Sequence, residues 1–154
     1  MTSDPQQAPG TSLPKRRKVQ VHVVCRYAES GIARFLVLQR PEARGSLWQP
    51  VTGNVEAGEE LLKAAQRELF EETSLWDLRR SARVFSFEFS KGDATIEETV
   101  FVAESVPCNV VLSAEHANWR WEPYQTARDL LAYDSNKQAL DRVAEFLRAN
   151  WRDL

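Results

Sequence analysis

The sequence predicts a layered α/β domain, because segments with the composition of β-strands alternate with segments that have helical periodicity. Strand-like runs rich in β-branched and aromatic residues lie at 19–27, 35–40, 84–89 and 99–103, whereas the apolar spacing at 59–73 is helical. The chain has 154 residues and 43% of them are hydrophobic, which is enough for one domain with its own core.

The amino-terminal residues 1–17 are predicted to be a disordered arm, since several prolines stand there among polar residues. Residues 18–154 are predicted to form a single domain. It begins with the strands at 19–27 and 35–40, which a turn at Glu29-Ser30-Gly31 would join as a hairpin or as two neighbouring strands.

The middle of the chain is predicted to change from loop to helix. Residues 41–58 are punctuated by glycine and proline, so we expect a loop there. Residues 59–73 are predicted to be helical, and Glu59 and Glu60 would favour the positive end of the helix dipole. The apolar face of this helix would carry Leu61, Leu62, Ala65 and Leu69.

The second half of the chain is predicted to hold further strands and two helices. The strands, two long and two short, are expected at 84–89, 99–103, 110–112 and 119–121. Pro123 can open a short helix that runs to Leu131. Ser135 and Gln138 match a capping box ahead of the last helix. The buried face of that helix is predicted to carry Leu140, Val143, Phe146 and Leu147.

Composition argues against several classes of partner. The net charge of −2 provides no basic field for a nucleic-acid backbone, and the basic run 15–18 is interpreted as a solvated arm. Cys25 and Cys108 are far apart and are expected to be reduced, as in a cytoplasmic protein. No apolar run is long enough for a membrane span or a signal peptide. We therefore expect a soluble monomer or homodimer that binds neither membrane nor nucleic acid.

The most informative feature is a set of carboxylates in the predicted helix. Glu68, Glu71 and Glu72 share one face at i, i+3 and i+4, where like charges repel by a few tenths of a kcal/mol per pair. A solvated acidic face is one interpretation. A site for a hard cation such as Mg²⁺, which prefers carboxylate oxygens, is the other. Glu59 and Arg67 accompany the cluster and favour the cation site, because Arg67 can bind a carboxylate through two hydrogen bonds.

These residues resemble the Nudix box, whose pattern is a glycine, five residues, a glutamate, seven residues, and then Arg-Glu-apolar followed by paired glutamates. Ser74 stands where the family usually has glycine, and we expect this to affect the turn after the helix alone. The resemblance implies a mixed β-sheet sandwiched between helices and the hydrolysis of a nucleoside diphosphate linked to another group. The pattern is filled by Gly53, Glu59, Arg67, Glu68, Leu69, Glu71, Glu72 and Leu75.

The resemblance also implies roles for single residues. The carbonyl of Gly53 and the carboxylates of the box would bind Mg²⁺ or Mn²⁺. Glu68 would take the proton from the attacking water, with Glu115 as the second candidate for this base. Arg67 would brace the cluster rather than touch the substrate. The implied metal ligands are Gly53, Glu68, Glu71, Glu72 and, from outside the box, Glu115.

Beyond the box, the chain is similar to bacterial dihydroneopterin triphosphate pyrophosphohydrolases, which also act on dATP. The stretches that carry this likeness are 38–40, 47–56, 114–116 and 135–139. The likeness implies a nucleotide or pterin phosphate as substrate. The implied substrate contacts are Arg40 at a phosphate, then Thr52, Asn136 and either Arg17 or Lys18. Trp48 is a further candidate contact, because its ring could stack on a flat base or pterin. The departure is the short segment 90–93, where that subfamily tends to have a longer, arginine-bearing loop.

Several alternatives stay open at this point. Trp48, Trp119 and Trp121 can belong to the core or the rim instead of stacking on a base, and His116 can be structural. The substrate could instead be ADP-ribose, a dinucleoside polyphosphate or another nucleotide conjugate. The domain could also bind nucleotides without catalysis, although the box carboxylates are all intact.

Overall fold

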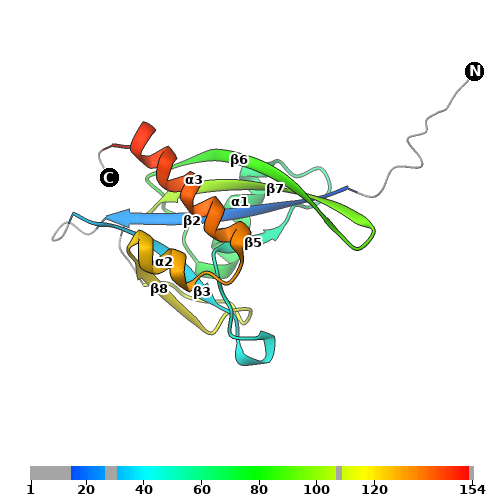
Figure 1. The fold of residues 1–154 in the computed structure, drawn as a ribbon, viewed down its shortest axis with the longest axis horizontal. Coiled ribbons are helices and arrows are strands. Elements are labelled where there is room, and N and C mark those ends of the chain that lie inside the picture. Colours follow the sequence, from blue (N-terminus) through cyan, green and yellow to red (C-terminus); the bar gives the residue numbers. More distant parts are fainter. Residues whose placement is uncertain (1–14, 27–30, 107–108, 153–154) are drawn as a thin grey trace, which may run out of the picture.

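The computed structural model describes residues 15–26, 31–106 and 109–152 as one mixed β-sheet with helices on both faces (Figure 1). In these residues the sheet has seven strands in the order β4-β3-β2-β7-β6, while β5 pairs with β2 and β8 pairs with β3. The predicted layered α/β architecture is confirmed. The strands are β2 (Lys15–Arg26), β3 (Ala33–Gln39), β4 (Trp48–Gln49), β5 (Val51–Asn54), β6 (Arg80–Lys91), β7 (Ala94–Glu104) and β8 (Asn118–Glu122). The helices are α1 (Leu61–Thr73), α2 (Tyr124–Leu130) and α3 (Asp134–Asn150), with a short 3-10 turn η2 (Glu42–Arg44).

Alternation along β2 divides the interior into two cores. Val19, Val21 and Val23 point to the face covered by α1, where Leu69 packs in the same cluster. Val24 points to the opposite face, where it packs with residues of α2 and α3. Figure 1 shows α3 crossing one face of the sheet, with α1 on the other. Because strand side chains alternate, one strand can hold both layers.

The amino-terminal boundary of the domain differs from the expectation. Strand β2 begins at Lys15 and pairs in parallel with β7 from the start, with Lys15 opposite Thr95. Residues 15–17 therefore belong to the sheet and not to the arm, because β7 offers backbone partners that the sequence alone did not reveal. Residues 1–14, Tyr27, the turn residues 29–30 and Cys108 lie outside the described residues.

The segment 41–58, predicted to be loop throughout, contains regular structure. It includes η2, β4 and β5, and β5 pairs with β2 in the register Val51 opposite Val21 and Gly53 opposite Val19. The prediction was wrong here because the strands are short and lie between prolines and glycines. Strand β5 is important for the site because it carries Gly53 next to α1.

Helix α1 begins two positions later than predicted. Glu60 is the N-cap residue and has extended backbone angles, and Gly58, two residues before it, has φ +77°. Glu59 therefore lies in the loop and not on the helix. At the other end Ser74 adopts a left-handed conformation with φ 64°, and its N–H donates to the carbonyl of Phe70. Serine thus ends the helix in the way expected for glycine, at a cost of about 1 kcal/mol.

The carboxyl-terminal helices occur where the sequence predicts them, with one error of detail. Pro123 is the N-cap residue of α2. Helix α3 starts at Asp134 after the N-cap Tyr133, and no side-chain hydrogen bond between described residues caps it, so the predicted capping box of Ser135 and Gln138 was wrong. The short strand expected at 110–112 is likewise not regular structure. None of the described helices is both long and apolar enough to cross a membrane.

Candidate active site

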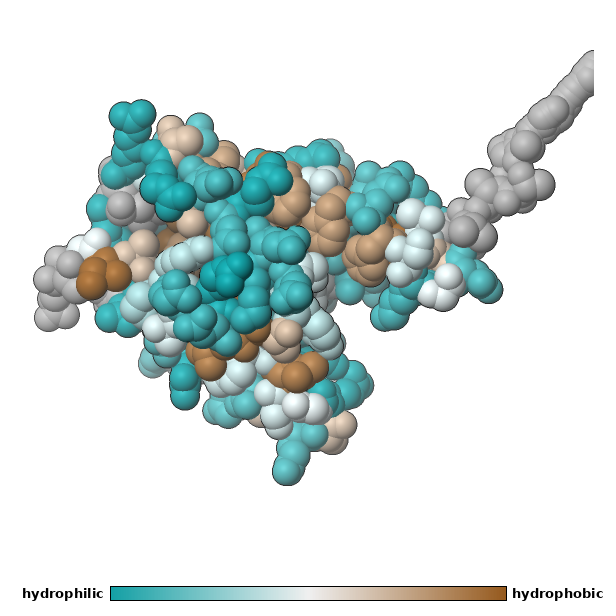
Figure 2. Space-filling model, viewed as in Figure 1, coloured by the Kyte–Doolittle hydropathy of each residue, from teal (hydrophilic) through white to brown (hydrophobic). Residues whose placement is uncertain are grey.

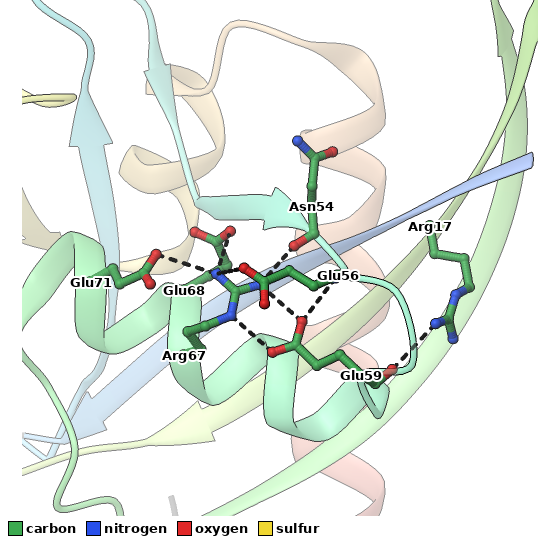
Figure 3. Close-up of polar contacts among 7 residues, drawn as sticks. All are labelled: Arg17, Asn54, Glu56, Glu59, Arg67, Glu68 and Glu71. Carbon is green, nitrogen blue, oxygen red and sulfur yellow. Dashed lines mark hydrogen bonds and ion pairs between the residues drawn. The ribbon is translucent and has the colours of Figure 1, made fainter.

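Arg67 joins helix α1 to the loop that precedes it (Figure 3). Its Nε donates to Glu59 Oε2 at 2.8 Å, and its Nη2 donates to Glu59 Oε1 at 3.0 Å. Nη2 also donates to the Asn54 carbonyl at 2.9 Å, while the Glu56 N–H donates to Glu59 Oε1 at 2.9 Å. The hydrogen bonds from Arg67, and next the one from Glu56, lower the pKa of Glu59 to about 2. The loop is thereby fixed to the helix.

The same guanidinium also contacts two box carboxylates. Arg67 Nη1 lies 3.3 Å from Glu68 Oε2 and 3.3 Å from Glu71 Oε1. The Glu68 side chain is only 14% exposed, whereas that of Glu71 is 54% exposed. One positive charge therefore offsets part of the repulsion among glutamates that share a helix face. These contacts agree with the predicted bracing position of Arg67.

Gly53 lies directly against the Glu68 carboxyl group. A Cβ atom at position 53 would overlap the carboxyl carbon and Oε2 of Glu68, so a side chain does not fit there. Gly53 is opposite Val19 in the register of β5 and β2, which places it on the α1 side of the sheet. Burial, the largest cause, raises the pKa of Glu68, while Arg67 acts in the opposite direction.

Glu72 is the buried member of the cluster, with only 3% of its surface exposed. Burial is the main cause that raises its pKa to about 9, and the charges of Glu68 and Glu115 add to this effect. Glu115 reaches the cluster because the segment before it is bonded to the end of α1. The Ser113 N–H donates to the Glu72 carbonyl at 3.4 Å, and the Glu115 N–H donates to Ser113 Oγ at 3.3 Å.

The donor set fits a hard divalent cation. Glu72 Oε1 is buried and has no hydrogen-bond partner among the described residues. The Glu68 carboxyl group lies beside the Gly53 backbone, and Glu115 is close enough to Glu68 and Glu72 to raise the pKa of both. A cation would relieve this repulsion. Within the described residues, the His, Cys, Asp and Glu side chains do not form a preassembled group of three or more ligands, so binding requires small side-chain movements.

Next to Glu72 lie three polar side chains: Gln49 and His116, which are buried, and Arg40, which is partly buried. Gln49 Nε2 lies 3.1 Å from His116 Nε2, and His116 Nδ1 lies 3.8 Å from Glu72 Oε1. Burial first, and then the charge of Arg40, lower the pKa of His116 to about 4. Arg40 Nε and His116 Nδ1 are buried without a hydrogen-bond partner among the described residues, as is Glu72 Oε1. Three unpaired polar atoms at one place are unusual and point to a functional site.

The comparison with known families decides what this arrangement is. A family model described as NUDIX domain matches residues 16–143. The chain belongs to the Nudix family. It is therefore a Nudix hydrolase of the pyrophosphohydrolase class, and the expectation from the box pattern is confirmed.

Relatives of this Nudix hydrolase include the Escherichia coli dihydroneopterin triphosphate diphosphatase. It is 30% identical over 141 residues, which are 82% of this chain and 92% of that protein. A solved structure of the E. coli dihydroneopterin triphosphate pyrophosphohydrolase has a TM-score of 0.64 at 27% identity, covering 85% of this chain and 97% of that one. The expected likeness to this subfamily is thus confirmed as a relationship.

Two further matches have a narrower meaning. An octanoyltransferase of Myxococcus xanthus is 34% identical over 138 residues, and the match covers 84% of this chain but only 37% of that protein. The chain therefore spans little more than a third of that relative. A C. elegans Ap4A hydrolase has a TM-score of 0.73 at 24% identity, covering 87% of this chain and 98% of that chain, which supports the fold alone.

The predicted substrate contacts of the Nudix domain are spread over both faces of the sheet. Thr52 is opposite Gln20, so its side chain lies on the α3 face, whereas Gly53 lies on the α1 face. Asn136 is buried in the first turn of α3. Arg17 Nη2 donates to the Glu59 carbonyl at 3.2 Å, so Arg17 contacts the loop of the box.

Trp48 is not next to the carboxylates. It packs against the core cluster of α2 and α3, the Arg120 guanidinium lies 5.2 Å from its ring centroid, and its carbonyl accepts from the Ala132 N–H at 3.0 Å. Trp119 and Trp121 belong to the core on the α1 face. The contacts of these three rings match the alternative in which they are core residues.

Phe85, Phe87 and Phe89 of β6 were not predicted as site residues. Their rings stack with centroid separations of 5.7 and 6.0 Å, and Figure 2 shows apolar side chains exposed over β6 and β7 beside α3. Phe85 and Phe87 line a pocket of about 370 Å³ with the first turns of α3. The only signal in the sequence was the alternation of apolar and polar residues in the predicted strand 84–89, which does not separate a binding surface from core.

A row of polar side chains leads from this pocket to the box loop. Phe87 is opposite Glu98, Glu98 is opposite Lys18, and Lys18 is opposite Asn54, across β6, β7, β2 and β5. Register partners point to the same face, so all four lie on the α3 side. Beside this row Gln20 Nε2 donates to Glu98 Oε2 at 2.6 Å.

Proposed function

We propose that this Nudix hydrolase uses Mg²⁺ or Mn²⁺ to cleave a phosphoanhydride bond of (deoxy)nucleoside triphosphates or dihydroneopterin triphosphate, releasing pyrophosphate. The observation that carries the proposal is the Glu68 carboxyl group, which lies against the Gly53 backbone and is close enough to the buried Glu72 for its charge to act there, as the charge of Glu115 does. A buried carboxyl group such as that of Glu72, whose pKa is raised by burial and by neighbouring negative charges, is stabilised in its ionised form by a bound cation.

Different residues of this cluster are proposed to bind the cation and to accept a proton. The carbonyl of Gly53 and the carboxylates of Glu68, Glu71, Glu72 and Glu115 would hold the cation. A bound cation would neutralise the pyrophosphate and make a bound water more acidic. Glu68 is the first candidate to take the proton of the attacking water, because burial raises its pKa and with it its proton affinity. Glu115 is the second candidate.

Arg40 is the proposed phosphate contact. Its Nε is buried and has no hydrogen-bond partner among the described residues, and its charge is close enough to Glu72 and His116 to lower the pKa of both. A guanidinium group presents donors in a planar fork that matches two phosphate oxygens. An arginine held at the edge of the carboxylate cluster is therefore suited to bind the triphosphate while the cation binds its other oxygens.

The flat ring of the substrate is proposed to bind on the α3 face of the sheet. Phe87 is the proposed stacking partner, because it lines the pocket beside the first turns of α3 while the Arg142 guanidinium already lies over the Phe85 ring, 4.3 Å from its centroid. Aromatic stacking contributes about 1–3 kcal/mol per base in single-strand binders. Thr52 and Asn136, expected near the substrate, are on this side of the molecule. The phosphates would then pass the edge of β5 to reach the carboxylates on the other face.

The relationship to the E. coli diphosphatase supports dihydroneopterin triphosphate and dATP as first candidates. The turn between β6 and β7 is tight, with Gly92 at φ +61° and Lys91 directly opposite Ala94. It replaces the longer arginine-bearing loop expected for that subfamily, so specificity can have shifted. ADP-ribose and dinucleoside polyphosphates are the alternatives. A non-catalytic nucleotide-binding domain is disfavoured by the intact set of box carboxylates.

A substrate panel tests the proposal. Purified protein with saturating Mg²⁺ would be given dATP and the other nucleotides, dihydroneopterin triphosphate, ADP-ribose and diadenosine tetraphosphate, and the release of pyrophosphate and orthophosphate would be measured separately. We expect pyrophosphate from dihydroneopterin triphosphate or dATP, well above the other compounds. A preference for ADP-ribose or the dinucleotide would overturn the substrate class. No cleavage of any compound would favour the binding domain. The Glu72→Gln protein is the matched control for contaminating phosphatases.

A further inference from the structure

His116 is fixed in place between three elements of the fold. The residue is only 6% exposed, and its backbone N–H donates to the Ser113 carbonyl at 3.3 Å. The next N–H, of Ala117, donates to the carbonyl of Gln39 at the end of β3 at 2.7 Å. Because Ser113 is itself bonded to the end of α1, the imidazole is held between α1, β3 and β4. Its position is therefore set by the backbone.

The two ring nitrogens of His116 face different partners. Nε2 faces the side-chain nitrogen of Gln49 at 3.1 Å, and Nδ1 faces Glu72 Oε1 at 3.8 Å. An amide nitrogen donates and does not accept, so Nε2 is the acceptor of that hydrogen bond. A neutral imidazole then carries its proton on Nδ1.

The Nδ1–H group thus points at an oxygen that has no other hydrogen-bond partner among the described residues. Glu72 Oε1 and His116 Nδ1 are both buried and both lack a bond at the present separation of 3.8 Å. A shift of less than 1 Å would convert this pair into a hydrogen bond of ordinary length. Such a bond would fix one carboxylate oxygen and leave the other one for the site shared with Glu68 and Glu115.

We propose that His116 is a positioning residue that orients Glu72 as a cation ligand, and that Gln49 sets the tautomer of His116 that can do so. The inference rests on the proposed function, because it requires Glu72 to bind the cation. Groups that orient metal ligands in this way typically change metal affinity by about 10- to 100-fold when they are removed.

Two amide substitutions separate positioning from packing. In His116→Asn the amide nitrogen can occupy the position of Nδ1, whereas in His116→Gln it reaches the position of Nε2. Both variants are polar and smaller than or similar in size to histidine, so their effects on folding should be alike. We expect Mn²⁺ binding to weaken about 10-fold or more in His116→Gln and to stay within about 3-fold of wild type in His116→Asn. Gln49→Met should weaken it by a smaller factor.

The full chain is titrated with Mn²⁺ in the absence of substrate, and the free ion is measured by electron paramagnetic resonance. The Tm of each variant is measured separately in EDTA. Equal Mn²⁺ affinity in both His116 variants would overturn the positioning role, whether the affinity is unchanged or equally reduced. Glu72→Gln separates this outcome from failure of the proposed function. If Glu72→Gln loses Mn²⁺ binding and His116→Gln does not, the cation site stands and the positioning role is wrong. If Glu72→Gln binds Mn²⁺ as well as wild type, both proposals are wrong.

Discussion

Arg67 binds Glu59 through two parallel hydrogen bonds, of 2.8 and 3.0 Å, across the junction between the box loop and helix α1. The pair fixes strand β5, which carries Gly53, and the loop after it relative to helix α1, which carries Glu68. Any relative movement of loop and helix would change the distance between the Gly53 carbonyl and the carboxylates. The geometry of the candidate cation site therefore depends on this ion pair, although neither partner needs to touch the substrate.

Arg67→Lys should lower kcat/KM by about 10- to 100-fold, because lysine cannot form the bidentate contact with Glu59 and the other hydrogen bonds of the guanidinium at once. The stability of the protein should change less than the activity, since lysine keeps the positive charge beside the partly buried Glu59. Steady-state kinetics and urea unfolding check this. Arg83→Lys, on the exposed side of β6, is the matched control. A variant with wild-type kinetics would contradict the bracing role.

Gly53→Ala should both destabilise the protein and reduce activity, because its Cβ would overlap the Glu68 carboxyl group. We expect a loss of about 1–3 kcal/mol in the free energy of unfolding, as for other overpacked sites. The same change in a Glu68→Ala background should cost much less, because the overlapping atoms are gone. A double-mutant cycle measured by urea unfolding tests this coupling. Additive losses in the two backgrounds would show that the overlap is relieved elsewhere.

Glu72 should make the stability of the protein in EDTA fall as pH rises. Its folded pKa of about 9 is above the ordinary glutamate value of 4.5, so the folded state holds a proton that the unfolded state releases. The contribution is fully present below about pH 4.5 and is lost as pH rises to about 9. Glu72→Gln, which resembles the protonated group, should remove this dependence and be more stable at pH 8 by about 1 kcal/mol or more.

Thermal unfolding at several pH values, with EDTA or with Mg²⁺, measures this effect. Mg²⁺ should raise the Tm of the wild type at pH 8 and have little effect on Glu72→Gln, since a ligand stabilises only the state that binds it. The same Glu72→Gln variant, and Glu68→Gln, should lower turnover by several orders of magnitude while the fold is retained. A pH-independent wild type in EDTA would show that Glu72 is ionised when it is buried.

Contacts between residues that are close in sequence could be predicted, whereas contacts between residues that are far apart in sequence could not. The carboxylates of α1 and the bracing by Arg67 follow from helical spacing, and the structure has them close together. Glu59 was misplaced because the helix start is set by Gly58 with φ +77° and the extended Glu60, not by the charge pattern. The strand β5 was missed because its partner β2 lies far away in sequence.

Contacts between distant segments were also beyond the sequence. His116 and Glu72 meet only because the residues before His116 are bonded to the end of α1. The stacked phenylalanines of β6 have the same alternation as a strand with one buried face, so their role in a pocket could not be predicted. Local periodicity was sufficient to predict most helices and strands, whereas predicting the site required knowing which of these elements lie next to one another.

Phe87→Ala should raise the KM for the ring-containing substrate by about 10-fold, which is within the range for loss of one stacking contact. Phe87 lines the pocket at the start of α3 and faces the same side of the sheet as Glu98. The turnover number should change much less, because the carboxylates are on the other face. Phe70→Ala removes a phenylalanine that is 52% exposed on α1 and is the control. Equal KM values in the two variants would contradict binding in this pocket.

Trp48→Ala should lower stability and leave the KM unchanged. The indole ring is partly buried against the core cluster of α2 and α3, and the Arg120 guanidinium lies 5.2 Å from its centroid. Its backbone also bonds to Ala132 beyond the end of α2. Truncation of a buried tryptophan costs about 3–5 kcal/mol, and partial exposure should put this one near the lower limit. Urea unfolding and substrate kinetics measured together separate the two roles. A several-fold rise in KM with unchanged stability would instead assign Trp48 to the substrate pocket, where its ring could stack on the substrate.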